Sequence, residues 1–83
     1  MRYHFNIIDR DGTCPDAEGV EFTSLVEATA HALKGARSLI CQDVQWGLLD
    51  LSGCITVTDE TGIVVYHLPF VEAVTVTPIA KAA

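Results

Sequence analysis

Apolar and polar residues alternate in short stretches at both ends of the chain, and one long helical pattern lies between them. The first stretch, residues 2–8, places a large apolar side chain at every second position, as in a strand that buries one face. Asp11 and Gly12 supply turn chemistry after it, and residues 20–22 are the expected returning strand. The pattern predicts a long, loose hairpin with a loop over residues 13–19. The side chains expected to face the core are Tyr3, Phe5 and Ile7.

A capping box opens the helical pattern. Ser24 is followed three residues later by Glu27, so the hydroxyl can accept a free backbone N–H while the carboxylate reaches back. Gly47 is the expected stop, because glycine readily takes the left-handed conformation that ends many helices. One apolar stripe at three- and four-residue steps predicts the face that packs on a sheet. The stripe contains Leu25, Ala28, Ala32, Leu33, Ala36, Leu39, Ile40 and Val44, and the opposite, polar side carries Glu27, His31, Lys34, Ser38, Gln42 and Gln45.

A second hairpin follows, with strands expected at residues 54–58 and 63–68 around a turn at residues 59–62. The last strand is apolar on both faces, although one helix can cover only one face of an antiparallel sheet. We therefore expect another molecule to cover its outward side chains. Val64, Tyr66 and Leu68 are expected to face inward, and the predicted interface consists of the outward residues Ile63, Val65 and His67.

The order of these elements, ββαββ, predicts an α+β fold with a single antiparallel sheet and one long helix packed on one face. Four strands are expected. Residues 70–73 can make a short turn of helix, and residues 74–77 alternate like a fifth strand that pairs with its own sheet or with a second subunit. We expect a single domain over residues 1–83, with an ordered core over residues 2–74 and a tail over residues 75–83.

Composition and charge narrow the class of protein. A chain of 83 residues with 49% hydrophobic residues is sufficient for one small domain and too apolar for a disordered chain. Its formal net charge of -6 repels phosphate backbones, so we expect no nucleic-acid binding. The apolar runs are far shorter than the ~20 residues of a membrane-crossing helix, and the N-terminus lacks the apolar region of a secretion signal. Three cysteines without a Cys-x-x-Cys pair fit a reducing compartment, and a cytoplasmic location is expected.

No residue cluster has the spacing that a known reaction, cofactor or metal demands. A calcium loop comes nearest, because Asp9, Asp11, Gly12 and Glu18 fall at positions 3, 5, 6 and 12 of a register that begins at Ile7. The aliphatic side chain of Ile7 cannot ligate calcium, so a solvated acidic hairpin is expected instead. We therefore expect no enzyme activity, no cofactor and no metal site.

Single residues supply the remaining candidates for chemistry. The cysteines and histidines do not show the short paired spacings of zinc sites. Cys41 and Cys54 are expected to be small buried hydrophobes, whereas Cys14 lies in a loop among carboxylates, which disfavours a nucleophilic thiolate. Trp46, near the end of the helix, is predicted to cover the core. His67 is expected to be an ordinary surface or interface histidine.

Several separated blocks resemble a family of small alphaproteobacterial domains of unknown function. The likeness spans residues 2 to about 74, and where that family often has an aromatic residue after Arg-Tyr, this chain has His4. The resemblance supports the predicted fold and implies no activity, cofactor or site. The blocks are Arg2-Tyr3-His4-Phe5-Asn6-Ile7, Asp11-Gly12, Asp16-x-Glu18-Gly19-Val20-Glu21-Phe22, Ala28-x-x-x-Ala32, Leu49-Asp50-Leu51-Ser52-Gly53 and Val57-Thr58-Asp59-Glu60-x-Gly62.

Three classes of function remain open at this point. The first is a non-enzymatic interaction or regulatory module that forms a homodimer through the open face or a strand edge of its sheet. The second is an acidic antitoxin-like protein that neutralises a basic toxin, since small sheets of this kind resemble the partial ribonuclease-H-like domain of HicB-type antitoxins. This chain lacks the separate DNA-binding domain that such antitoxins usually carry. The third, ranked last, is an enzyme or small-ligand binder with a pocket between the helix and a loop.

Overall fold

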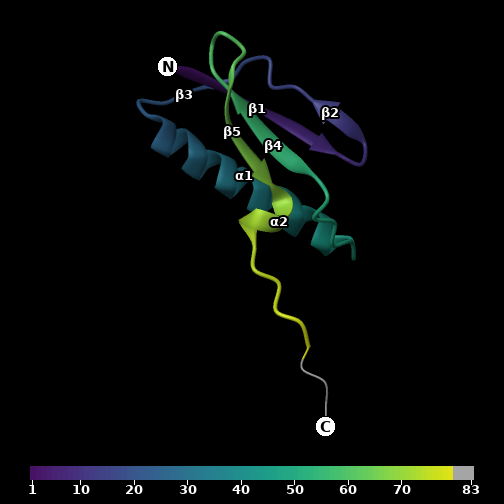
Figure 1. Cartoon of the computed structure of the whole chain (residues 1–83). Helices are drawn as coiled ribbons and strands as arrows, with labels where there is room; N and C mark the ends of the chain where they lie inside the picture. The colour runs from purple at the N-terminus through teal and green to yellow at the C-terminus, as the bar shows by residue number, and fades with distance from the viewer. Residues whose placement is uncertain (80–83) are drawn as a thin grey trace.

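The computed structural model of the chain describes residues 1–79. One antiparallel sheet of five strands carries one long helix, which confirms the predicted α+β fold (Figure 1). The strand order is β2-β1-β4-β5, and β3 also pairs with β1. The elements are β1 (Arg2–Asp9), β2 (Gly12–Cys14), β3 (Val20–Glu21), α1 (Leu25–Gln45), β4 (Cys54–Thr58), β5 (Val64–Pro69) and α2 (Phe70–Ala73).

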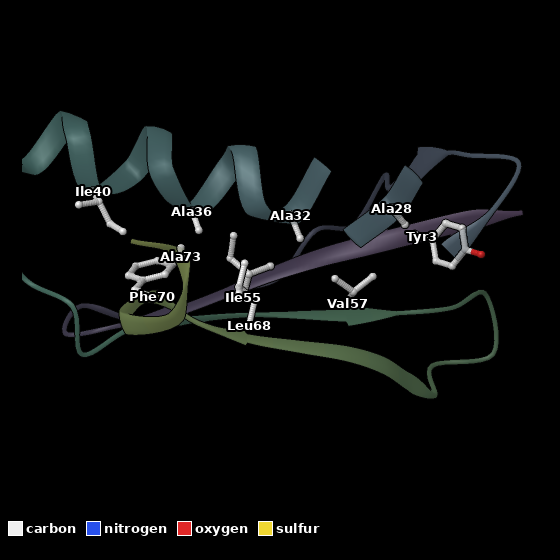
Figure 2. Packing of buried hydrophobic residues seen from close by; sticks show 10 residues of the cluster. All are labelled: Tyr3, Ala28, Ala32, Ala36, Ile40, Ile55, Val57, Leu68, Phe70 and Ala73. Atoms are coloured by element: carbon white, nitrogen blue, oxygen red, sulfur yellow. The ribbon is translucent and has the colours of Figure 1, made fainter. Parts of the chain in front are cut away.

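The register of the central strands decides which side chains face the helix. β1 and β4 place Phe5 opposite Val57 and Ile7 opposite Ile55, and β5 places Leu68 opposite Ile55. Ile55, Val57 and Leu68 lie on the inner face of the sheet, beneath the small residues of α1 (Figure 2). Phe5 and Ile7 pack against the same buried cluster. The buried cluster consists of Tyr3, Ala28, Ala32, Ala36, Ile40, Ile55, Val57, Leu68, Phe70 and Ala73.

Both predicted ends of α1 are confirmed. The Ser24 hydroxyl accepts the backbone N–H of Glu27 at 3.3 Å, whereas the Glu27 carboxylate accepts from the hydroxyl of Thr23. At the other end Gly47 has a φ of 80°, and the N–H of Leu48 donates to the carbonyl of residue 43 at 3.0 Å. This pattern is a Schellman motif, which satisfies the last carbonyl groups of the helix.

The N-terminal hairpin differs from the predicted long loop. Residues 10 and 11 make a tight turn, and the chain returns at once as β2, with Gly12 opposite Asp9. β3 then pairs with the start of the same strand, where Val20 lies opposite Tyr3. Between β2 and β3, Asp16 binds the middle of β1. The fifth strand of the sheet is therefore β2, which the sequence pattern concealed because its three exposed residues do not alternate in polarity.

Residues after β5 follow the prediction in part. The short helical turn α2 forms, and Arg37 Nε donates to the carbonyl of Ala73 at 2.8 Å, which holds α2 against α1. Residues 74–77 do not form the predicted strand and lead away from the sheet (Figure 1). Within residues 1–79, no helix combines the length and the hydropathy needed to cross a membrane.

Candidate protein interface

β5 forms one edge of the sheet, and part of its backbone faces away from its neighbour β4. The N–H of Phe70 donates to the carbonyl of Gly53 at 2.9 Å, on the β4 side. Successive residues of a strand direct their backbone groups to opposite sides, so Leu68 faces β4 and His67 directs its N–H and C=O to the free edge. Pro69 lacks an N–H at a position that faces the same free side, where proline is tolerated. No strand among residues 1–79 pairs with this edge.

A β-bulge changes which side chains of β5 are exposed. Tyr66 lies opposite Val57, but Val64 rather than Val65 lies opposite Thr58. Val65 is the extra residue, and it is half-buried against the core cluster instead of facing fully outward. The expectation that Val64 faces inward is wrong, because 56% of its surface is exposed.

The turn before β5 presents a second exposed aliphatic side chain. Ile63 is 62% exposed, and its backbone N–H donates to Asp59 Oδ1 at 3.1 Å. The same oxygen accepts the hydroxyl and the N–H of Thr61, at 2.6 and 2.8 Å. The Thr61 hydroxyl, followed by backbone N–H groups that include that of Ile63, lowers the pKa of Asp59 below its ordinary value. A charged carboxylate thus fixes the turn that carries Ile63 beside Val64.

The outer face of the sheet is more polar than the pattern of β5 alone indicates. The amide of Asn6 donates to the carbonyl of Thr56 at 3.3 Å and lies 3.4 Å from the hydroxyl of Thr58. Thr56 Oγ1 lies 3.4 Å from Nδ1 of His67, which is exposed. These contacts make hydrogen bonds within the face itself. The apolar surface available to a partner is therefore concentrated at the start of β5, on Ile63 and Val64.

The opposite edge of the sheet is protected. Asp16 Oδ2 accepts the N–H of Phe5 at 3.1 Å, and its Oδ1 accepts the N–H of Gly19 at 3.0 Å. Burial raises the pKa of Asp16, but these two donors and the nearby charge of His4 outweigh it, so the pKa lies below the ordinary value. Further along this edge Arg2 lies 3.7 Å from the carboxylate of Glu21. Bound carboxylates and charges are typical of an edge that resists pairing with another chain.

A groove runs between α1 and the inner face of β1, on the side of the helix that faces away from α2. Its volume is about 290 Å³, and its lining is mostly apolar. At one end the ring of His31 lies 4.7 Å from that of Phe5 and 5.2 Å from that of Phe22, measured between ring centroids. The groove is lined by Phe5, Ile7, His31, Ala32, Gly35, Ser38, Leu39 and Ile55.

Leu39 also lines a second cavity of about 210 Å³, which is acidic. Here Arg10 Nη1 lies 3.2 Å from Asp43 Oδ2 and 3.1 Å from Asp50 Oδ2. The hydrogen bond to Asp43, and then that to Asp50, raises the pKa of the guanidinium. Hydrogen bonds from Ser52, followed by that from Arg10, lower the pKa of Asp50. With Asp9 and Asp11 also in the lining, four acidic residues and one arginine line this cavity.

Residues 2–71 match the model of a family described as a domain of unknown function, DUF6894. The chain belongs to the DUF6894 family. No curated protein and no solved structure matches it. The match spans every strand of this DUF6894 domain and the helix between them, and it carries no activity or binding site with it.

The expectation about Trp46 at the end of α1 is wrong. Trp46 does not cover the core of the DUF6894 domain, because its side chain is 86% exposed beyond the last turn of the helix. Leu48 and Leu49 are exposed as well, and only Leu51 of this connector packs on the buried cluster. The helix ends at the Schellman motif of Gly47, and the two leucines that follow directly lie outside the core.

The remaining predicted residues do not meet in one site. Cys41 is exposed on α1 rather than buried, Cys14 is exposed on β2, and Cys54 is half-buried on β4. Within residues 1–79 of the DUF6894 domain, no group of three histidine, cysteine or acidic side chains is placed to hold a metal ion. In the former calcium-loop candidate, Asp9 Oδ1 accepts the N–H of Asp11 at 2.8 Å and closes the tight turn. The sequence pattern did not predict the groove or the acidic cavity, because the residues that line the two come from four separate segments of the sequence.

Proposed function

We propose that this DUF6894 domain is a non-enzymatic interaction module of the cytoplasm that forms a homodimer through β5. The observation that carries the proposal is the free edge of β5, which has exposed apolar residues at its start and no formally charged side chain along its length. Edge strands that avoid association are usually short, charged, bulged or covered. The edge formed by β2 and β3 uses several of these devices, whereas β5 has only a bulge and a terminal proline.

A second copy is the natural partner for such an edge. Two β5 strands can pair antiparallel about a two-fold axis, so that each copy offers the same backbone groups to the other. In this arrangement His67 would use its free N–H and C=O in the new ladder, and Val64 and Ile63 would be shielded by the partner. The two sheets would then form one continuous sheet.

The core of the domain is small, so burial of further apolar side chains by a partner would matter for its stability. Within residues 1–79, three of the four buried residues of α1 are alanines, so α1 approaches the sheet closely but contributes little apolar area. A domain of this size buries only about 60% of the surface that its unfolded chain exposes. The isolated fold buries few large side chains. Pairing at β5 would bury more apolar surface and so stabilise the folded chain further.

Light scattering coupled to size exclusion, over a range of protein concentrations, tests the proposal. We expect a dimer whose dissociation constant rises about tenfold in Val64→Glu, because a charge replaces an apolar contact at the interface. Val26→Glu is the matched control, since Val26 is 77% exposed on the first turn of α1, where an acidic residue suits the helix dipole. A monomer at every concentration, or equal effects of the two substitutions, would refute the dimer through β5.

A second candidate is an acidic antitoxin-like protein that neutralises a basic toxin. The formal net charge of -6 and the four carboxylates around Arg10 favour a basic protein as partner. Co-expression with a small basic protein encoded beside this gene should relieve growth arrest if this function is correct. Growth arrest that persists, with no complex recovered, would count against it.

A further inference from the structure

We infer that the groove between α1 and β1 receives the C-terminal segment of a second copy of this chain. In the bound form Ile79 lies on the apolar floor and Lys81 reaches the acidic cavity beside it. This inference rests on the self-association proposed above, to which it adds a second contact. It concerns a different surface from β5, so each contact can be tested separately.

The floor of the groove is apolar and incompletely covered by the domain itself. Phe5, Ile7 and Leu39 are only half-buried, although all three contact the core cluster. The groove volume of about 290 Å³ lies at the lower limit of small-ligand sites, which span ~300–1,000 Å³. It is thus suited to a few side chains rather than to a large cofactor.

Gly35 keeps part of this groove open. A Cβ atom built on Gly35 would lie 3.8 Å from Ile55 Cδ1, an ordinary contact, so packing within the domain does not require glycine at this position. Glycine inside a helix costs about 1 kcal/mol relative to alanine. Gly35 therefore weakens the helix at this position. A larger side chain here would reduce the volume of the groove.

The charge of the neighbouring cavity indicates which kind of segment would bind in the groove. The acidic cavity adjoins the groove at Leu39, and its four carboxylates exceed its single guanidinium by three charges. A segment that joins an apolar side chain to a cation complements this combination of an apolar floor and an acidic end. Residues 74–83 contain that combination, since Ile79 is followed two residues later by Lys81.

The position of the tail favours binding to another copy. Ile79 is 95% exposed, and residues 74–79 lead away from the domain after α2 (Figure 1). α2 is held on the flank of α1 that carries Arg37, whereas the groove lies on the other flank. In an extended segment, residues two positions apart point to the same side about 6.6 Å apart, so Ile79 and Lys81 can enter neighbouring cavities together. The five described residues 75–79 span about 17 Å when extended.

A synthetic peptide with the sequence of residues 74–83 tests the contact on the full chain. The acceptor is the Ile79→Asp variant, whose own tail should no longer compete, and binding is followed by fluorescence anisotropy of the labelled peptide. We expect saturable binding, weakened about 10- to 100-fold when the peptide carries Ile79→Asp, as for the loss of one buried isoleucine side chain. A peptide with Lys81→Glu should bind about two- to fivefold more weakly, the range of an exposed ion pair.

Two substitutions at Gly35 provide matched acceptors. Gly35→Leu fills the groove and should abolish peptide binding, whereas Gly35→Ala adds only the methyl group that the structure accommodates and should retain it. Thermal unfolding of both variants checks that each is folded. Lack of peptide binding by the Ile79→Asp chain, or equal binding by the two Gly35 variants, would overturn the inference.

Light scattering separates this contact from the one at β5. In the full chain, Ile79→Asp should raise the dimer dissociation constant, and its effect should multiply with that of Val64→Glu because the two surfaces are distinct. If Ile79→Asp leaves the dimer unchanged while the peptide still binds, the tail occupies the groove of its own chain and the second-copy assignment is wrong. If Val64→Glu alone has no effect while the peptide binds, the failure lies with the β5 edge and not with the groove.

Discussion

The ring of Phe70 occupies the place where a side chain on Gly53 would stand. A Cβ atom on Gly53 would come within 2.8 Å of Phe70 Cε2 and within 2.8 Å of the carbonyl oxygen of Ile8. The carbonyl of Gly53 also accepts the N–H of Phe70 at 2.9 Å. This pair joins the start of β4 to the start of α2.

Gly53→Ala is expected to lower the free energy of unfolding by about 1–3 kcal/mol, the range for an extra methyl group forced into a packed site. Urea denaturation followed by circular dichroism measures this change. Phe70→Leu should cost less stability in the Gly53→Ala background than in the natural chain, because the smaller side chain relieves the contact with the ring while the carbonyl of Ile8 remains in contact. Unchanged stability in Gly53→Ala would show that the close approach is not required.

Gly35→Ala is expected to raise the free energy of unfolding by about 0.5–1 kcal/mol. The new methyl group meets Ile55 at an ordinary distance, and the helix gains a better helix-forming residue. Ala30→Gly, at an exposed position of the same helix, is the reciprocal control and should destabilise by a similar amount. A loss of stability in Gly35→Ala would mean that the groove is too narrow for a methyl group.

Asp16→Asn is expected to destabilise the domain by about 1 kcal/mol at pH 7, once solvent screening is allowed for. The ionised carboxylate accepts N–H groups from Phe5 and Gly19, and its pKa is lowered in the folded state. A lowered pKa means that this stabilisation is complete above the unfolded-state pKa of ~3.9 and is lost as the pH falls through the folded-state pKa.

The difference in stability between the natural chain and Asp16→Asn should therefore narrow at acidic pH, which urea denaturation at pH 7 and pH 3 can measure. Glu18→Gln is the matched control, since it removes the same charge from the same loop, where no hydrogen bond to the Glu18 side chain forms within residues 1–79. A difference that stays constant with pH would show that the carboxylate charge does not contribute.

Trp46→Ser is expected to change the free energy of unfolding by less than about 0.5 kcal/mol, as for a largely exposed surface side chain. Because Trp46 is the single tryptophan and is largely exposed, its fluorescence maximum should shift little on unfolding in urea. A strongly blue-shifted emission that moves to the red on unfolding would mean that this side chain is covered, for example by a partner.

Local chemistry made most of the fold predictable. The capping residue Ser24, the helix stop Gly47 and the turn at residues 59–62 act through contacts with their immediate neighbours, and the structure shows each at its predicted place. The strand β4 also has the predicted bounds, residues 54–58, since its alternation of buried and half-buried positions follows the period of a strand. These features depend on a few consecutive residues and need no partner far away in the sequence.

The candidate surfaces were harder to predict because they depend on distant partners. The bulge opposite Val57 reverses the expected exposure of Val64 and Val65, and a shift of one residue in strand pairing is not visible in an apolar run. His31 follows the polar side of the helical pattern, yet its ring packs against those of Phe5 and Phe22. Neither the bulge nor the packing of His31 can be recognised from the residues of its own segment alone.

The amino-acid sequence by itself determined the kind and order of the elements and the family, because turn chemistry, capping and periodicity are local properties. Only the tertiary structure decided that β2 completes the sheet, that β5 is left as a free edge, and that an apolar groove meets an acidic cavity at Leu39. The reason is physical: pairing partners, bulges and grooves arise where segments distant in sequence meet, and the free energy of those contacts belongs to no single segment.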